Sequence, residues 1–167
     1  AKRHNIPLGH LVFAHGDLAE GEHNTLEAAR SAYKRAEDGS EDELAALFRW
    51  EELFHIQLFD HNGSIEYVKG MLDNVPPTMD AKSQVYAIWL ELVTTPDEAL
   101  ELYRVVPENS VQEVDAWNAY DQLLSEQIDI CETVKEALAL YHEHSCELGE
   151  REFLTATLNA LGKKLKG

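Results

Sequence analysis

A pattern of large apolar side chains recurs four times along the chain, and this repeat limits the fold more than any other feature of the sequence. The four copies begin at Thr25, Ser64, Thr95 and Thr133. At fixed distances from these starts the copies carry Tyr33, Leu72, Tyr103 and Tyr141, then Trp50, Trp89, Tyr120 and Leu158, and then Leu53, Leu92, Leu123 and Leu161. Self-similarity over a period of roughly 20 to 50 residues is typical of repeat architectures. The sequence therefore predicts four related structural units.

Each copy has the features of two helices. Four Ser or Thr residues are followed three positions later by Glu, as in a capping box at a helix start: Ser40 and Glu43, Thr95 and Glu98, Ser110 and Glu113, Thr133 and Glu136. Apolar residues follow steps of three and four, as in Ala99, Leu102, Tyr103 and Val106, and this spacing favours amphipathic helices over strands. The predicted fold class is all-α.

The expected helices span residues 8–22, 25–36, 41–60, 65–74, 80–93, 96–106, 111–130, 133–144 and 149–164. The first of them aligns with the second helix of a copy, and we expect it to form a cap in front of the first repeat. The copies starting at Ser64 and Thr95 are only 31 residues apart, against 39 and 38 for the other intervals. The last helix of the second copy is therefore expected to be shorter by about two turns.

A unit of two helices cannot bury its own apolar stripe, but neighbouring units that stack side by side can. The pattern resembles that of α-solenoid helical-repeat proteins, with a unit size similar to tetratricopeptide and HEAT-type repeats. The resemblance implies a single all-α repeat domain over 1–167, with a cap at 1–23 and repeats at 24–63, 64–93, 94–131 and 132–167. It departs from the tetratricopeptide pattern, whose unit is 34 residues, so that family's peptide-binding residues are not transferred. A globular helical bundle of the same helices is the alternative.

The charge of the chain bears on its partners. The 31 acidic residues outnumber the 14 basic ones, for a net charge of -17. Such a field repels nucleic-acid phosphate and anionic membranes and favours a basic protein partner. Cys131 and Cys146 are too few for a disulfide framework and are expected to be free thiols in a cytoplasmic protein. No apolar run reaches the roughly 18 residues of a membrane-spanning helix.

These features predict a non-enzymatic module that binds a protein partner through one row of helices, as a scaffold or as an inhibitor. The sharper form of this prediction is a partner with a basic surface, and no cofactor is expected. No glycine-rich phosphate loop and no nucleophile-elbow motif occurs in the sequence. Trp50, Trp89 and Trp117 are expected in the core, because the repeat fixes where large side chains fall.

The alternative function is a metal protein that resembles the ferritin-like di-iron bundles. Glu20 and His23, and likewise Glu52 and His55, have the Glu-x-x-His spacing that places a carboxylate and an imidazole on one helix face. Against this reading, Gly21 interrupts the first pair, and the second half of the chain offers no third pair. The repeat also accounts for Glu52 without a metal, because polar residues stand at the matching positions of the other copies.

Overall fold

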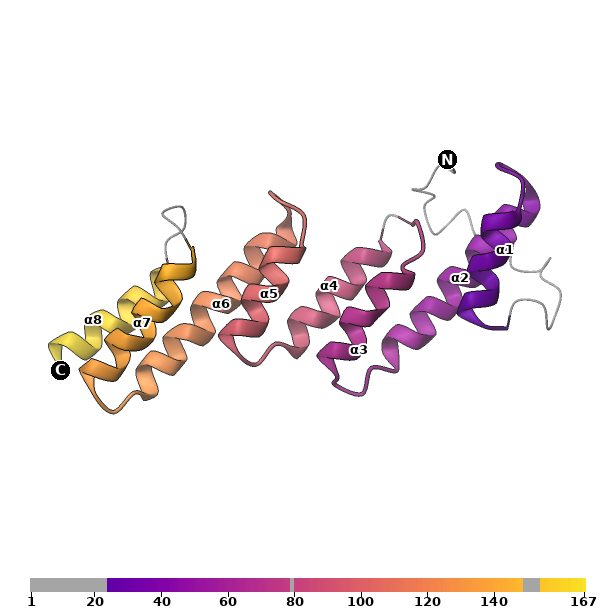
Figure 1. The fold of residues 1–167 in the computed structure, drawn as a ribbon. Coiled ribbons are helices and arrows are strands. Elements are labelled where there is room, and N and C mark those ends of the chain that lie inside the picture. Colours follow the sequence, from indigo (N-terminus) through magenta and orange to yellow (C-terminus); the bar gives the residue numbers. More distant parts are fainter. Residues whose placement is uncertain (1–23, 79, 149–153) are drawn as a thin grey trace. The chain divides into compact units, whose positions relative to one another are not determined.

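The computed structural model describes residues 24–78, 80–148 and 154–167, and this part of the chain is all-α (Figure 1). Its helices are α1 (Leu26–Arg35), α2 (Glu41–Phe59), α3 (Ile65–Gly70), α4 (Ala81–Leu92), α5 (Pro96–Val105), α6 (Val111–Ile130), α7 (Val134–Leu148) and α8 (Thr155–Lys166). A short 3-10 helix, η3 (Met71–Asn74), directly follows α3. None of the helices in these ranges combines the length and the apolar character that crossing a membrane requires.

The all-α prediction is confirmed, and most expected helices lie within one or two residues of their predicted bounds. The helix expected at 8–22 lies outside the described residues. α4 has 12 residues and α2 has 19, so the expected shortening of about two turns is confirmed. The expectation for 149–164 is wrong at its start, because α8 begins at Thr155. The helix expected at 133–144 extends further, to Leu148.

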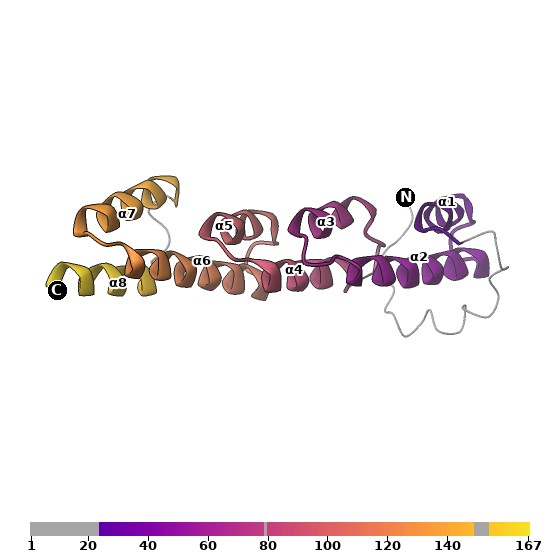
Figure 2. The same cartoon turned by 90° about the horizontal axis from the view of Figure 1, so that it is seen from below.

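The chain divides into two compact units, unit 1 (residues 1–92) and unit 2 (residues 93–167). In unit 1, α1 and α3 lie in one layer and α2 and α4 in a second layer (Figure 2). In unit 2, α5 and α7 lie in one layer and α6 and α8 in a second layer. The division lies one residue from the predicted boundary between the second and third repeats. How the units combine, as a solenoid or as a bundle, stays a prediction.

The first helix of every pair buries a small or branched side chain at the same place in the repeat. Ala29, Val68, Ala99 and Ala137 are fully buried. Each stands four positions after the Ser or Thr that precedes its helix. Small side chains let two helix backbones approach closely, so this position is where each first helix packs against its neighbours.

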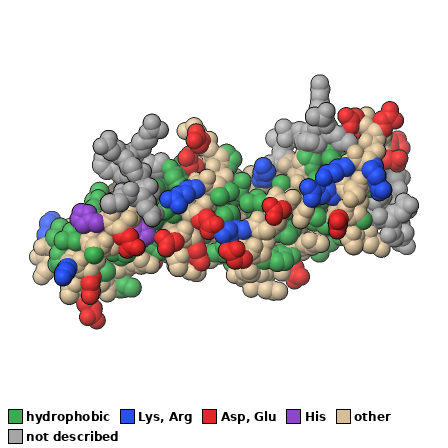
Figure 3. All heavy atoms as spheres, viewed as in Figure 1, with side chains coloured by type: hydrophobic (Ala, Val, Ile, Leu, Met, Phe, Trp, Pro, Cys, Tyr) green, Lys and Arg blue, Asp and Glu red, His purple; other side chains and the backbone are tan. Residues whose placement is uncertain are grey.

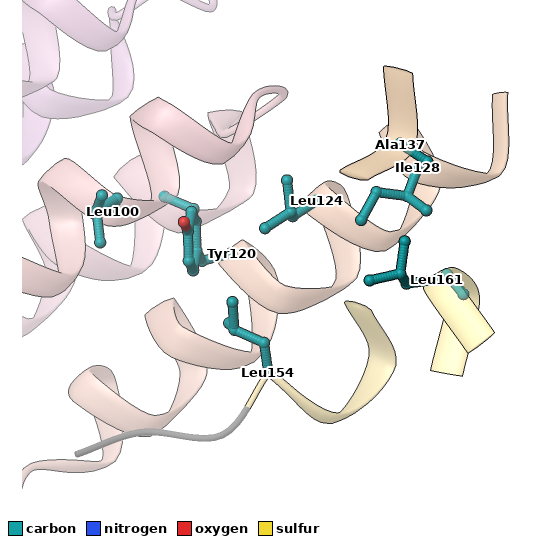
Figure 4. Close-up of a cluster of buried hydrophobic side chains, with 9 residues drawn as sticks. Leu100, Tyr120, Leu124, Ile128, Ala137, Leu154 and Leu161 are labelled. Carbon is teal, nitrogen blue, oxygen red and sulfur yellow. The ribbon is translucent and has the colours of Figure 1, made fainter. Parts of the chain in front are cut away.

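Unit 2 has a continuous apolar core contributed by all four of its helices (Figure 4). Its central side chains are Tyr120, Leu124 and Ile128, which lie at steps of four on α6 and are all fully buried. The other members are Ala99, Leu100, Ala137, Leu154, Ala160 and Leu161. Complete burial of one large apolar side chain contributes about 1.5–3 kcal/mol, so this cluster accounts for much of the stability of the unit.

The large apolar side chains of the repeat differ in how deeply they are buried. Trp50 and Trp89 are buried, which confirms the prediction for these two residues. At the same position of the other two copies, Tyr120 is buried and Leu158 is 40% exposed. The start of α8 is fixed by contacts from α6, described below, and α8 then buries its neighbour Thr157 in place of Leu158. Trp117, the third residue predicted in the core, does not meet the prediction in full: it is only partly buried and packs against the core cluster of unit 2, with its ring 5.0 Å from that of Tyr103.

Two of the expected capping boxes form as predicted. The Thr95 hydroxyl accepts from the backbone N–H of Glu98, and the Glu98 carboxylate accepts from the backbone N–H of Thr95. Thr133 and Glu136 make the same reciprocal pair, with both distances 3.2 Å. These contacts satisfy amide groups that have no partner within the helix.

The turn before α2 forms a variant of the capping box. Ser40 Oγ accepts from Glu43 N–H at 3.1 Å and donates to the carbonyl of Glu37 at 2.6 Å. The Glu43 carboxylate accepts from the N–H of Gly39, whose φ is +81°, and not from that of Ser40. The reason is that the Ser40 N–H already donates to the carbonyl of Glu37.

The turn before α6 repeats this variant contact for contact. Ser110 Oγ accepts from Glu113 N–H at 3.1 Å and donates to the carbonyl of Pro107 at 2.6 Å. Asn109, with φ of +61°, donates its N–H to the Glu113 carboxylate at 2.6 Å. Glycine and asparagine tolerate positive φ best, which explains why they occupy this place in the two turns. The α1–α2 and α5–α6 hairpins therefore turn in the same way.

Candidate functional site

The predicted metal ligands of α2 do not converge. Glu52 Oε2 lies 2.6 Å from the Arg49 guanidinium, one turn back on the same helix. His55 Nε2 lies 2.7 Å from Oε1 of a different carboxyl group, that of Glu51. Glu20 and His23 lie outside the described residues. Within the described ranges, no group of three or more His, Cys, Asp or Glu side chains is arranged to hold a metal ion.

Glu51 is the centre of the polar cluster that the structure places here, although it is not one of the predicted ligands. Its side chain sits in the core face of α2 and is only 1% exposed. Thr78 Oγ1 donates to Glu51 Oε2 at 2.6 Å, and His55 occupies the other oxygen. Because a buried carboxyl group is costly without partners, these two contacts are what make the position tolerable. The cluster links α2 to the segment that leads into α4.

Asp121 is the matching residue of unit 2. It lies 26 positions after Thr95, as Glu51 lies 26 positions after Thr25. Asp121 Oδ2 accepts from the N–H of Ala156 at 2.8 Å, and Oδ1 accepts from the N–H of Thr157 at 2.9 Å. The Thr157 hydroxyl also donates to the carbonyl oxygen of Asp121.

These contacts make Asp121 a cap for α8 that comes from another helix. The residue before α8, Leu154, provides no side-chain cap of its own. A carboxylate at a helix N-terminus is favoured by the amide groups and by the helix dipole. A shared feature of the sequence could have identified the pair, because an acid stands beside the buried aromatic residue in copies one and three, at Glu51 and Asp121.

A second polar contact in unit 1 joins three elements around Trp50. The Trp50 indole N–H donates to the carbonyl of Asn74 at 2.9 Å, and Arg30 donates to the side-chain oxygen of Asn74 at 2.7 Å. The Arg30 guanidinium also lies over the Trp50 ring, 5.9 Å from its centroid. Trp50 therefore serves as a structural anchor between α1, α2 and η3, with its polar atom satisfied in the core.

The pKa shifts in the described residues follow from burial and capping. Burial raises the pKa of Tyr33 to about 12, and the negative charges of Glu43 and Asp38 act in the same direction. The hydrogen bond from the Thr94 backbone N–H lowers the pKa of Glu98, and further hydrogen bonds from Thr94 and Thr95 add to this effect against desolvation. These shifts belong to the core and to a helix cap.

The described residues carry acidic side chains and several large apolar side chains at the surface. Acidic side chains lie at the surface of both units in the face drawn in Figure 3. α6 carries five acidic residues and no lysine or arginine. In unit 1, Ile56 and Phe59 near the end of α2 are 60% and 70% exposed. In unit 2, the exposed apolar side chains include Val111, Ile130 and Leu165.

Comparison with known proteins gives no guide to the function of this chain. No protein-family model, no curated protein and no solved structure matches the chain. The chain's own residues point to its function: two buried acids have structural partners, and apolar side chains are exposed on an acidic surface.

Proposed function

We propose that this chain is a protein-interaction module in which pairs of helices stack as an α-solenoid and one row of helices binds a protein partner with a basic surface. The observation that carries the proposal is the match between the α1–α2 and α5–α6 hairpins. They share their turn hydrogen bonds and bury a common set of positions in their second helices, while the residues on their exposed faces differ. A constant framework with a variable surface is what repeat modules use to bind partners.

The second helices of the two hairpins share five buried positions. With α2 and α6 aligned 70 residues apart, the positions buried in both are Ala46 and Ala116, Trp50 and Tyr120, Glu51 and Asp121, Phe54 and Leu124, and Leu58 and Ile128. The buried acids contribute to structure in the two hairpins, since each has partners that tie it to a neighbouring segment. Because Glu51 and Asp121 occupy matching positions and serve to hold segments together, they favour a binding function of the chain over acid–base chemistry at either residue.

The charge of the surface favours a basic partner. A net charge of -17 on 167 residues raises the local concentration and the association rate of a positively charged protein. Such binding weakens as salt rises, because exposed charges are screened over about 10 Å at 0.1 M ionic strength. The salt dependence of binding therefore separates an electrostatic partner from a purely apolar one.

Affinity capture from native cell extract tests this proposal. The tagged full chain is incubated with nuclease-treated extract, washed at about 0.05 M and at about 0.5 M salt, and the retained proteins are identified by mass spectrometry. We expect one protein in near-stoichiometric amount at low salt and a large loss at high salt. An eluate with the tagged chain alone at low salt would contradict the proposal.

A further inference from the structure

The last two turns of α2 expose an isoleucine and a phenylalanine side by side. Ile56 and Phe59 are three positions apart on the helix, so their side chains lie on the same face. The two side chains are 60% and 70% exposed. Most exposed positions of α1 and α2 carry polar or charged residues, so a neighbouring Ile and Phe at the surface need an explanation beyond the folding of unit 1.

α6 provides an internal comparison for these two positions. With the alignment given above, Ile56 matches Glu126 and Phe59 matches Asp129, and all four side chains are exposed. The next position is Asp60, the residue that follows α2, and it matches the exposed Ile130 at the end of α6. The same helix framework therefore accepts acids where α2 carries Ile and Phe, and neither side chain is required by the packing.

The charged side chains closest to Ile56 and Phe59 in the sequence have a net negative charge, because Arg49 offsets Glu52 and Asp60 is exposed. Asp60 follows Phe59 directly and is exposed, and Glu52 lies one turn before Ile56. Arg49 is the only lysine or arginine in α2, and its guanidinium pairs with Glu52. An apolar pair beside an exposed acid, on a chain of net charge -17, complements a segment that presents apolar side chains beside positive ones.

We propose that Ile56 and Phe59 form a docking site for an amphipathic helix of another protein whose apolar face is flanked by Lys and Arg. This inference rests on the proposed interaction function and names the surface and the partner chemistry. Apolar side chains of the partner pack on the ridge that Ile56 and Phe59 form along α2, as in helix-on-helix packing. A lysine or arginine of the partner then lies over Asp60. The site is small, so the contact it forms is of moderate affinity and salt-sensitive.

The test uses the full chain and synthetic helical peptides of about 18 residues. One peptide places Leu on one face and Lys on the other, a second replaces every Lys by Glu, and a third scrambles the Leu–Lys sequence. Binding is followed by nuclear magnetic resonance of the labelled chain, which locates the affected amides. We expect the Leu–Lys peptide to shift the amides around Ile56 and Phe59, and the other two peptides to bind at least about tenfold more weakly.

Matched variants come from the comparison of the two helices. Ile56→Glu with Phe59→Asp places in α2 the residues that α6 carries, and Ile130→Asp makes the reverse exchange in α6 as a control. We expect the double variant to weaken the Leu–Lys peptide by about tenfold or more and Ile130→Asp to leave it unchanged. Circular dichroism checks that each variant keeps its helix content. If the double variant unfolds, Ile56→Ala with Phe59→Ala takes its place.

Four results would overturn the inference. The first is binding of the Leu–Lys peptide that the double variant does not weaken, and the second is equal binding of the Leu–Glu peptide. The third is sedimentation in which the wild-type chain is a dimer and the double variant a monomer, since a second copy would then occupy the site. A protein captured equally by wild type and double variant overturns this site while it leaves the interaction function intact, so the two failures are distinguishable.

Discussion

Thr78 donates a hydrogen bond of 2.6 Å from its hydroxyl to the carboxyl group of Glu51, and both side chains are buried. Glu51→Ala leaves the Thr78 hydroxyl and the His55 imidazole without this partner, and we expect the free energy of unfolding to fall by about 2–3 kcal/mol. Urea unfolding followed by circular dichroism measures it. Glu52→Ala is the control, because a partly exposed ion pair with Arg49 contributes less than about 1 kcal/mol. Equal losses would show that Glu51 does not anchor unit 1.

Asp121 caps α8 across unit 2. In the Asp121→Ala variant the N–H groups of Ala156 and Thr157 lose their acceptors, and we expect α8 to fray and the free energy of unfolding to fall by about 1–3 kcal/mol. Hydrogen exchange of these two amides is the direct measurement, and it should become faster than in the wild type. Unchanged exchange at both amides would rule out a capping role for Asp121.

The raised pKa of Tyr33 makes the stability of unit 1 depend on pH in the alkaline range. The folded pKa of about 12 lies above the ordinary value of 10.0, so the folded chain holds the phenol proton more tightly than the unfolded chain. The resulting stabilisation is fully present below pH 10.0 and is lost as pH rises from there towards about 12. Unfolding measured by urea at several alkaline pH values should show a shallower loss in Tyr33→Phe. Parallel curves for the wild type and the variant would contradict the assignment.

Trp89 and Leu158 stand at the same position of the predicted repeat but differ in burial. Trp89 is 1% exposed, so Trp89→Ala creates a cavity and should cost about 3–5 kcal/mol. Leu158 is 40% exposed and leaves a much smaller cavity, so Leu158→Ala should cost about 1 kcal/mol or less. Chemical unfolding of the two variants gives the comparison. A larger loss for Leu158→Ala would mean that α8 packs through a different face.

Much of the all-α fold could be predicted from local sequence signals. Ser or Thr followed by Glu identified the starts of α2, α5, α6 and α7, since a cap acts within four residues of its helix. The helical spacing of apolar residues identified the buried face of α6, including Tyr120 and Leu124. The start of α8 could not be predicted in this way, because its cap is Asp121, more than thirty residues away in the sequence.

The candidate sites show the same difference between local and distant contacts. The sequence shows the i, i+3 spacing of Glu52 and His55, which suggests that they act as a pair. In the structure the partner of His55 is instead Glu51, four residues before it. The second partner of Glu51, Thr78, lies 27 residues further along and brings no motif with it. The exposure of a side chain also depends on distant contacts: no local signal distinguishes Ile56 and Phe59 from core residues, and only the packing of α2 shows that they lie at the surface.

The central claim is that this chain binds a protein partner through an exposed helix face. The most direct measurement is the ratio of partner to tagged chain after capture from native extract, for the wild type, for Ile56→Glu with Phe59→Asp, and for Ile130→Asp. We predict a near-stoichiometric partner for the wild type and Ile130→Asp at low salt, and a ratio about tenfold lower for the double variant. A wild-type chain that retains no protein in comparable amount at low salt would contradict the claim.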